Sequence, residues 1–221
     1  MVPTTFYDLS QPIFHDAPQW PEYDPVVVSR RHTIAYEGFN AERLELTTHS
    51  GTHVDVPFHF FENGATVDQI PVDAFTGPCV ALDLRHKAPA SVIGRDDLSR
   101  FAGSIEPGTI VLIKTGWGDK RAVTSEYLKA WPYLDRQAAE YLVERDVKGV
   151  GTDTLSIGGI GESERSRAPH LPLLGAKKFI IEDMRIPDEL LDGKKRFLCA
   201  FPILIAGAGA GWARPVAWDF E

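Results

Sequence analysis

Three histidines and an aspartate stand together in the segment HSGTHVDVPFH, residues 49–59, of a chain that has only seven histidines. Gly51 and two β-branched residues disfavour a helix here, so the segment is predicted to be a strand that leads into a tight loop. In an extended chain His53 and Asp55 point to the same side, because side chains alternate with a period of two. Gly51 allows the sharp backbone turn that would bring His49 to them.

Two imidazoles and a carboxylate that meet at one point can bind a borderline divalent cation such as Zn²⁺ or Mn²⁺. Structural histidines on a polar loop are the alternative, which suits any one histidine better than it suits all three. His59 lies beyond Pro57 and is predicted to have a second role, proton relay beside the metal site, since histidine has an ordinary pKa of about 6.5. A fourth metal ligand and a hydrogen bond to another ligand are the other roles open to it.

Further donors are expected downstream, because three protein ligands leave a metal ion with open positions, as in catalytic centres. His170 and Glu182 are available, and Glu182 ends the apolar run FIIE. A carboxylate in that place needs a partner, since isolated buried charge is costly. The five side chains together are enough for a centre of two metal ions, bridged by Asp55 and Glu182.

A mixed α/β (α+β) fold is predicted to position these residues. Runs rich in β-branched and aromatic residues predict strands at 6–10, 25–34, 42–49, 79–84, 109–116, 148–154, 178–184 and 197–205. RLELT, within 42–49, alternates apolar and polar residues as a half-buried strand does. Helices are predicted at 134–147, with Asp135 as N-cap, at 124–131 and at 94–102. No repeat or change of composition divides residues 1–221, so one domain with a largely central sheet is expected.

The composition is that of an ordinary globular protein, with 43% hydrophobic and 24% charged residues. A net charge of −8 disfavours nucleic acid or an anionic membrane as a partner. The N-terminal sequence has no signal-peptide pattern and no apolar run approaches the ~20 residues of a membrane span, so a cytoplasmic location is predicted. Cys79 and Cys199 lie in apolar stretches and are interpreted as small buried side chains, not as a disulfide.

Three other stretches are weighed against more specific roles. GAGAGW, residues 207–212, lacks the spacing of a nucleotide-binding loop and is predicted to be a turn between strands. Ser156 does not stand in a nucleophile-elbow sequence, so residues 151–159 are expected to form a strand-end loop that shapes the pocket. SERSR, residues 163–167, is expected to be an exposed, mobile loop; the alternative is that Arg165 or Arg167 binds a substrate carboxylate.

The segment 49–59 matches the signature His-x-Gly-Thr-His-x-Asp-x-Pro-x-His. With it, nearly the whole chain resembles the metal-dependent cyclase/hydrolase family that includes bacterial kynurenine formamidase and isatin hydrolase; YDLSQPI, VLIKTGW, GVGTDTLSI and FPILIAGAGAGWARPVAW are also similar to that family. The resemblance implies a swivelling β/β/α fold with a barrel-like core flanked by helices. It also implies one or two divalent metal ions per subunit and a homo-oligomer, a dimer or a tetramer.

The resemblance assigns roles to single residues. Five positions match the metal ligands of the family: His49, His53 and Asp55 for one ion, and His170 and Glu182 with Asp55 for a second. His59 matches its proton donor and acceptor. Trp20, in APQWPEYDP, matches a tryptophan that lines the substrate pocket, with simple packing as the alternative. Two departures leave the substrate open, since formamidases of this kind tend to have Gly-Ala-His in place of Gly-Thr-His and a Pro-Gly-Asp turn in place of PEYDP.

These residues predict an enzyme that hydrolyses an amide, formamide or cyclic amide bond of a small molecule through metal-activated water, with His59 as proton donor and acceptor. A lactone hydrolase or cyclase that uses the same site is one alternative. Another is a catalytically silent protein that uses its metal to bind a small molecule, although such a protein has no use for a spare base beside the metal.

Overall fold

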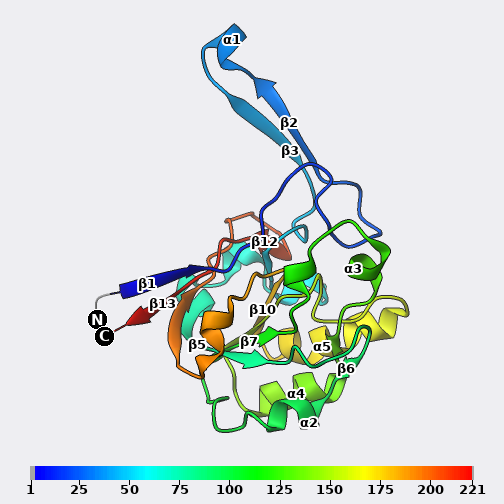
Figure 1. The fold of residues 1–221 in the computed structure, drawn as a ribbon, viewed down its shortest axis with the longest axis vertical. Coiled ribbons are helices and arrows are strands. Elements are labelled where there is room, and N and C mark those ends of the chain that lie inside the picture. The colour runs from blue at the N-terminus through cyan, green and yellow to red at the C-terminus, as the bar shows by residue number, and fades with distance from the viewer. Residues whose placement is uncertain (1–2, 221) are drawn as a thin grey trace.

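A central mixed sheet runs through the structure, a computed structural model that describes residues 3–220. Its strands are β1 (Pro3–Asp8), β4 (His53–Asp55), β5 (Thr76–Asp83), β7 (Ile110–Lys114), β9 (Gly149–Thr152), β10 (Phe179–Glu182), β11 (Arg196–Cys199), β12 (Ala210–Trp212) and β13 (Val216–Phe220). They pair in the order β1-β13-β11-β5-β7-β9-β10-β4-β12 (Figure 1). The four middle strands, β5 to β10, are parallel, and those on either side pair antiparallel. The mixed α/β class with a central sheet is confirmed.

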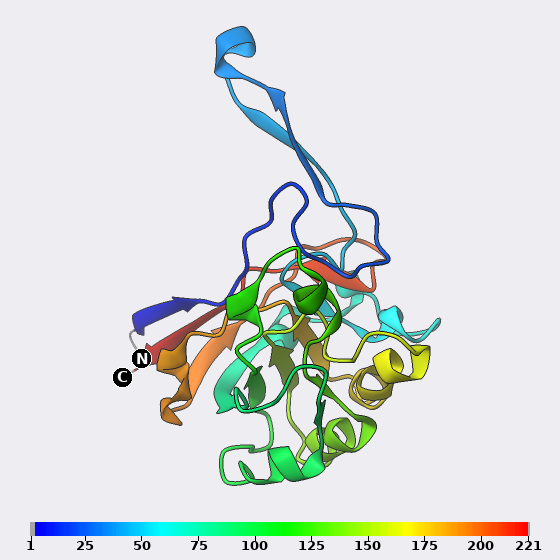
Figure 2. The ribbon, with the colours of Figure 1, turned by 45° about the vertical axis from the view of Figure 1, so that its right-hand side comes forward.

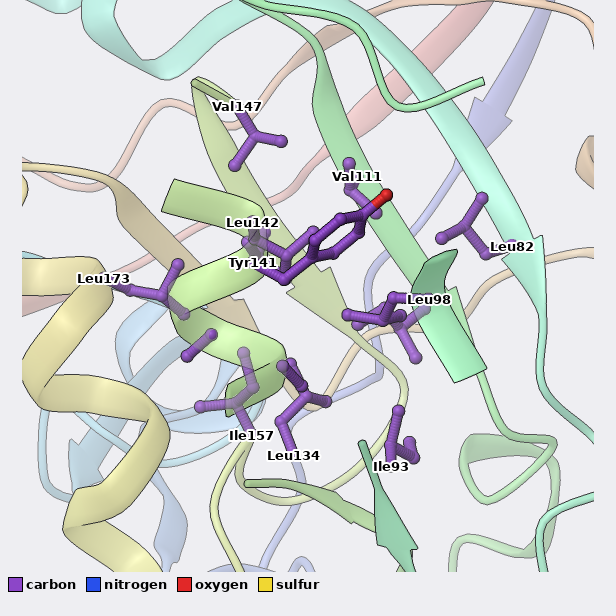
Figure 3. Packing of buried hydrophobic residues seen from close by; sticks show 14 of the residues in the cluster. Leu82, Ile93, Leu98, Val111, Leu134, Tyr141, Leu142, Val147, Ile157 and Leu173 are labelled. Atoms are coloured by element: carbon purple, nitrogen blue, oxygen red, sulfur yellow. The ribbon is translucent and has the colours of Figure 1, made fainter. Parts of the chain in front are cut away.

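Helices cover one face of the parallel strands. These are α2 (Arg95–Ser99), α4 (Arg136–Glu144) and α5 (Ser163–Gly175), each in a connection between two parallel strands. Figure 3 shows Tyr141 and Leu142 of α4 packed between Val111 of the sheet and Leu173 of α5. The opposite face packs on a second apolar cluster, so both faces of these strands are buried. Such strands are continuous apolar runs, as IVLIK in β7 illustrates.

The predicted helix at 134–147 is confirmed as α4. The Asp135 carboxylate accepts a hydrogen bond from the Ala138 N–H over 2.8 Å, as an N-cap should. The helices predicted at 94–102 and 124–131 are confirmed as α2 and as α3 (Ser125–Lys129), each shorter than predicted. The remaining short elements are β6 (Val92–Ile93), β8 (Tyr133–Leu134), η1 (Pro57–His59), η2 (Val67–Gln69), η3 (Val72–Phe75), η4 (Gly118–Lys120) and η5 (Asp188–Asp192).

A hairpin arm projects from the body of the molecule (Figures 1 and 2). It consists of β2 (Val27–His32), α1 (Ile34–Glu37) and β3 (Ala41–Glu45), and its strands form a separate two-stranded sheet. The strand expected within 42–49 is confirmed as β3, but its expected half-burial is wrong, because every residue of β3 after Ala41 is exposed. Alternation marks a strand with two unlike faces, but burial also needs an element that covers one of them.

Two other expectations are wrong. The expected loop at 163–167 is the first turn of α5, whose prolines at 169 and 172 and mixed polarity hide the helix from pattern reading. The strand expected at 197–205 ends at Cys199, and Phe201 and Leu204 beyond it are exposed. Pro202, which has no N–H to donate, makes only an isolated bridge there.

The structure also bears on the predictions made for the two cysteines and for membrane-spanning segments. Cys79 and Cys199 are free thiols; Cys79 is buried, as expected, and burial raises the pKa of its thiol to about 12, whereas Cys199 is half-buried and the expected burial is wrong for it. Within residues 3–220, no helix combines the length and the apolar character that crossing a membrane requires.

Candidate metal centre and active site

The candidate ligands are positioned by strand register. β4 lies between β10 and β12, with His53 opposite Glu182 and Asp55 opposite Ile180. Residues opposite each other in an antiparallel pair point to the same side of the sheet. Because Ile180 packs in the core beneath the helices, these ligands lie on the face that α5 covers, and His170 of α5 completes the group. The site therefore stands at the carboxyl end of a parallel strand, where α/β sheets commonly bind ligands.

Two turns bring the remaining signature histidines to the same place. Gly51 has a φ of +69°, in the left-handed region, and this turn places the Nδ1 atom of His49 2.9 Å from the Oδ1 atom of Asp55. After β4, η1 turns the chain back, so that the rings of His59 and His49 lie close together, with centroids 3.9 Å apart and planes tilted by 32°. Gly209 packs directly against the backbone of this turn, since a Cβ at that position would lie 2.9 Å from the backbone nitrogen of His59. The GAGAGW stretch thus supplies close backbone packing and β12.

The structure brings together all five predicted ligands and His59. The Nε2 atom of His53 lies 3.3 Å from Asp55 Oδ1 and 3.5 Å from Glu182 Oε2. The Nε2 atom of His170 lies 3.1 Å from Glu182 Oε1 and 3.8 Å from Asp55 Oδ2. Two sets have donor atoms within 4.8 Å of one another: His49, Asp55 and His59, and His53, Asp55 and Glu182. Asp55 belongs to both sets, as a carboxylate between two ions would.

Three buried atoms of this group have no hydrogen-bond partner. They are the Nε2 atom of His53 and both carboxylate oxygens of Asp55. Asp55 has histidine nitrogens at contact distance, but their directions do not make hydrogen bonds. Orphaned buried polar atoms are rare because each costs free energy, and coordination of a cation would satisfy all three. The donors present, imidazoles and carboxylates, fit Zn²⁺ or Mn²⁺.

Hydrogen bonds with backbone groups and with one serine hydroxyl orient three of the candidate ligands. The Nδ1 atoms of His53 and His170 donate to the carbonyls of Gly51, at 2.8 Å, and Ser166, at 2.7 Å. A carbonyl can only accept, so Nδ1 of each ring carries a proton, and Nε2 is the nitrogen that is available to a cation once any proton on it is lost. Glu182 Oε1 accepts hydrogen bonds from the Ser156 hydroxyl, at 3.0 Å, and the Ile157 N–H, at 2.7 Å.

Sequence reasoning therefore placed Ser156 near the pocket but missed its contact with the carboxylate. The apolar and hydroxyl residues of GTDTLSI gave no signal for that contact, which depends on how β9 and β10 pair.

Burial and mutual charge set the protonation of the group. Burial acts to lower the pKa of His53, but the Asp55 and Glu182 carboxylates outweigh it and raise the pKa to about 9. Burial acts to raise the pKa of Asp55, but the surrounding histidines hold it well below its usual range. Burial, with His49 and His170 nearby, lowers the pKa of His59 to about 4. At neutral pH His59 is thus an uncharged base beside an ionised carboxylate.

A cavity of about 250 Å³ borders His59 and three of the candidate ligands, His49, His170 and Glu182. It is lined by Trp20, Glu22, Tyr23, His49, His59, Phe60, Leu155, Ser156, Ser166, His170 and Glu182. Trp20 stands on this wall, as the resemblance implies, and its ring packs edge-on against Trp131 with centroids 5.8 Å apart. Glu22 and Tyr23 were not singled out from the sequence, although they form part of the PEYDP departure.

The two arginines of α5 lie outside this lining. Arg165 donates to the Ile160 carbonyl and its guanidinium lies over the Tyr133 ring. The Arg167 guanidinium lies over the ring of Phe60, one of the lining residues, 5.7 Å from its centre. Neither side chain borders the cavity within the described part of the chain, so a carboxylate-binding role for them has no support in this geometry.

Comparison with known proteins gives concordant matches. A family model described as "Putative cyclase" matches residues 7–158. The kynurenine formamidase of Bacillus thuringiensis subsp. konkukian is 27% identical over 217 residues, which cover 98% of each chain. The solved structure of a potential metal-dependent hydrolase with cyclase activity is 30% identical, covers 98% of each chain and has a TM-score of 0.79. Isatin hydrolase A from Labrenzia aggregata, 24% identical, has the same fold, with a TM-score of 0.85 over 98% of this chain and 94% of that one.

Proposed function

This chain belongs to the cyclase family, and from that premise we propose that it is a metal-dependent hydrolase that cleaves the carbon–nitrogen bond of an amide, formamide or cyclic amide. One observation carries the proposal: the orphaned donor atoms of His53 and Asp55 lie next to Glu182 and His49, which line a cavity that the imidazole of His59 also lines. The kynurenine formamidases and the isatin hydrolase among its relatives support a C–N bond as the target.

The residues that would hold the metal are His49, His53, Asp55, His170 and Glu182, for one or two ions of Zn²⁺ or Mn²⁺. A divalent cation in this place would supply Lewis acidity, which activates water and polarises a carbonyl oxygen. Ser156 and the backbone of Ile157 keep the Glu182 carboxylate oriented for it.

His59 would move the proton. Its imidazole makes no side-chain hydrogen bond within residues 3–220, so a ring nitrogen is free to accept a proton from water as the water oxygen bonds to the carbonyl carbon. When the C–N bond breaks, the same nitrogen gives that proton to the departing amine. Trp20, Tyr23 and Phe60 line the cavity above and would exclude bulk water. The products are a carboxylic acid and an amine, or one amino acid where the amide is cyclic.

A hydrolysis panel tests this function. The protein is reconstituted with Zn²⁺ or Mn²⁺ and assayed on N-formyl-L-kynurenine, on isatin and on a simple aryl lactone, with His59→Ala as the matched control. Turnover of an amide substrate that depends on both metal and His59 is the expected result. Turnover of the lactone alone would favour the lactonase alternative. Tight metal binding without hydrolysis of any N-formyl, lactam or lactone compound would favour a binding protein and contradict the proposal.

We further propose that the subunits form a homo-oligomer through the β2–α1–β3 arm. Four of its large apolar side chains are exposed: Ile34 by 64%, Tyr36 by 90%, Phe39 by 53% and Leu44 by 48%. A two-stranded hairpin is marginally stable on its own, and clustered exposed apolar groups are typical of an interaction surface. A second copy of the chain is the partner proposed, and a cytoplasmic location stays a prediction.

A further inference from the structure

A buried ion pair stands directly beside the proposed metal centre. The Arg121 and Asp183 side chains are only 6% and 2% exposed. Arg121 donates from Nη2 to Asp183 Oδ2 over 2.9 Å, and from Nε to both carboxylate oxygens over 3.2 Å. Asp183 immediately follows Glu182, so this pair is one peptide unit away from a proposed metal ligand.

The same guanidinium also holds the segment that forms the pocket wall. It donates from Nη1 to the Pro12 carbonyl, at 3.0 Å, and from Nη2 to the Pro18 carbonyl, at 3.4 Å. Residues 11–26 contain no helix or strand, so their backbone is fixed by individual contacts such as these. Trp20 and Tyr23, which line the cavity, follow directly after the second contact.

Asp183 in turn contacts the signature loop. Its carbonyl accepts a hydrogen bond from the Thr52 hydroxyl, at 2.6 Å, and Thr52 precedes His53. The Thr52 oxygen itself accepts from the Gln11 N–H, at 2.8 Å, which closes a ring of contacts back to the N-terminal segment. Asp183 has a φ of +50°, a left-handed conformation that is unfavourable for most residues other than glycine. Such a conformation persists only where surrounding contacts over-determine it.

We propose that Arg121 and Asp183 are positioning residues that hold the pocket wall of Trp20 and Tyr23 in register with the metal-binding side chains. Stability alone does not account for the pair, because a buried ion pair is frequently replaceable without loss of stability. A planar fork that joins one carboxylate to two carbonyls instead supplies fixed geometry. The catalytic consequence rests on the function proposed above, whereas the effect on the wall does not.

Arg121→Lys tests the pair, since it keeps the charge and loses the fork. In hydrogen–deuterium exchange on the metal-loaded protein, amides in residues 12–23 exchange faster than in the wild type. With the substrate identified by the hydrolysis panel, kcat/KM falls by about 10–10²-fold, mainly through KM, at unchanged metal content. Arg85→Lys, in an exposed pair with Asp83, is the matched control and leaves both readouts unchanged. Wild-type exchange and wild-type KM in Arg121→Lys would overturn the proposal.

A second variant separates positioning from stability. Arg121→Gln/Asp183→Asn removes both charges together, so that no unpaired charge is left buried, and asparagine tolerates the left-handed backbone. The proposal predicts faster exchange in residues 12–23 and a raised KM even where the melting temperature matches that of the wild type. Exchange and KM at wild-type values in this variant would show a dispensable structural pair. If the wild type hydrolyses none of the panel, the proposed function fails, and the exchange data still decide on the positioning role.

Discussion

The metal-site strands and the hairpin arm are both built from short β-segments, but their surroundings are opposite. In β4 every residue is buried and pairs with a residue on each adjoining strand, and His53 and Asp55 lie on the face that α5 covers. In the arm, β2 and β3 form a separate two-stranded sheet that projects from the body (Figure 1), and Tyr36 of α1 is 90% exposed. The proposed metal ligands therefore all come from the body, whereas the arm exposes apolar side chains, for which a second copy of the chain is the proposed partner. Substitutions in the two regions should accordingly affect different properties.

The largest effect is expected in the body, from Asp55→Asn. This change keeps the shape but removes the charge that both donor sets share. Turnover should fall by more than the roughly 10²–10⁴-fold expected for a lost acid–base group. A steady-state assay against Asp146→Asn, an exposed aspartate, measures the loss. Equal activity of the two variants would remove Asp55 from the site.

His59→Ala should lower turnover by about 10²–10⁴-fold and leave the bound metal in place. The reason is that His59 is assigned to proton transfer and not to metal binding. Paired measurements of kcat and metal content check this, with the exposed His15→Ala as control. Loss of the metal from His59→Ala would make His59 a ligand, as its grouping with His49 and Asp55 permits.

Raising the pH should lower the stability of the metal-free protein and increase its affinity for metal. The folded-state pKa of His53 is raised to about 9 by Asp55 and Glu182 against the effect of burial. Its contribution to the stability of the metal-free protein is therefore complete below about pH 6.5 and is lost as the pH rises towards 9. Metal must displace that proton, so apparent metal affinity should rise by up to about tenfold per pH unit over this range. Denaturant unfolding and calorimetric titrations at pH 6 and 9 measure the two trends, and a metal affinity independent of pH would contradict them.

The smallest effect on folding is expected in the arm. Tyr36→Ser/Phe39→Ser should change the stability of the subunit by no more than about 0.5 kcal/mol, because both side chains are exposed. The assembly, in contrast, should shift towards the monomer, since the apolar contact surface is lost. Light scattering coupled to size-exclusion chromatography measures the mass, alongside a thermal melt. An unchanged oligomer would show that association uses another surface.

Features of the fold and of the candidate site that depend on neighbouring residues in the sequence could be predicted, whereas those that depend on distant segments could not. The candidate metal-binding segment could be predicted because its geometry is local: side chains alternate along the strand, so His53 and Asp55 share a side, and Gly51 makes one tight turn. α4 was readable because its cap and its apolar spacing are local. His170 was a candidate as a downstream donor and the family resemblance strengthened that prediction, but its place on a helix was not predicted, because proline and polar residues conceal the helix.

What sequence reasoning missed depends on contacts between distant segments. The exposure of β3 depends on whether anything covers it, which alternation within RLELT does not encode. The Ser156 contact with Glu182 and the Arg121 contacts with Pro12 and Pro18 arise only when separate loops meet at one end of the sheet. Serine and arginine side chains make many kinds of contact in proteins, so their types and spacing alone did not indicate these particular hydrogen bonds.

The most direct test of the central claim is the metal content of the protein after reconstitution with Zn²⁺ or Mn²⁺ and removal of free ion, in the wild type and in Asp55→Asn. We expect the wild type to retain one or two equivalents of metal per subunit and the variant to lose that metal. A wild-type protein that retains no divalent metal, or a variant that retains as much as the wild type, would contradict that claim.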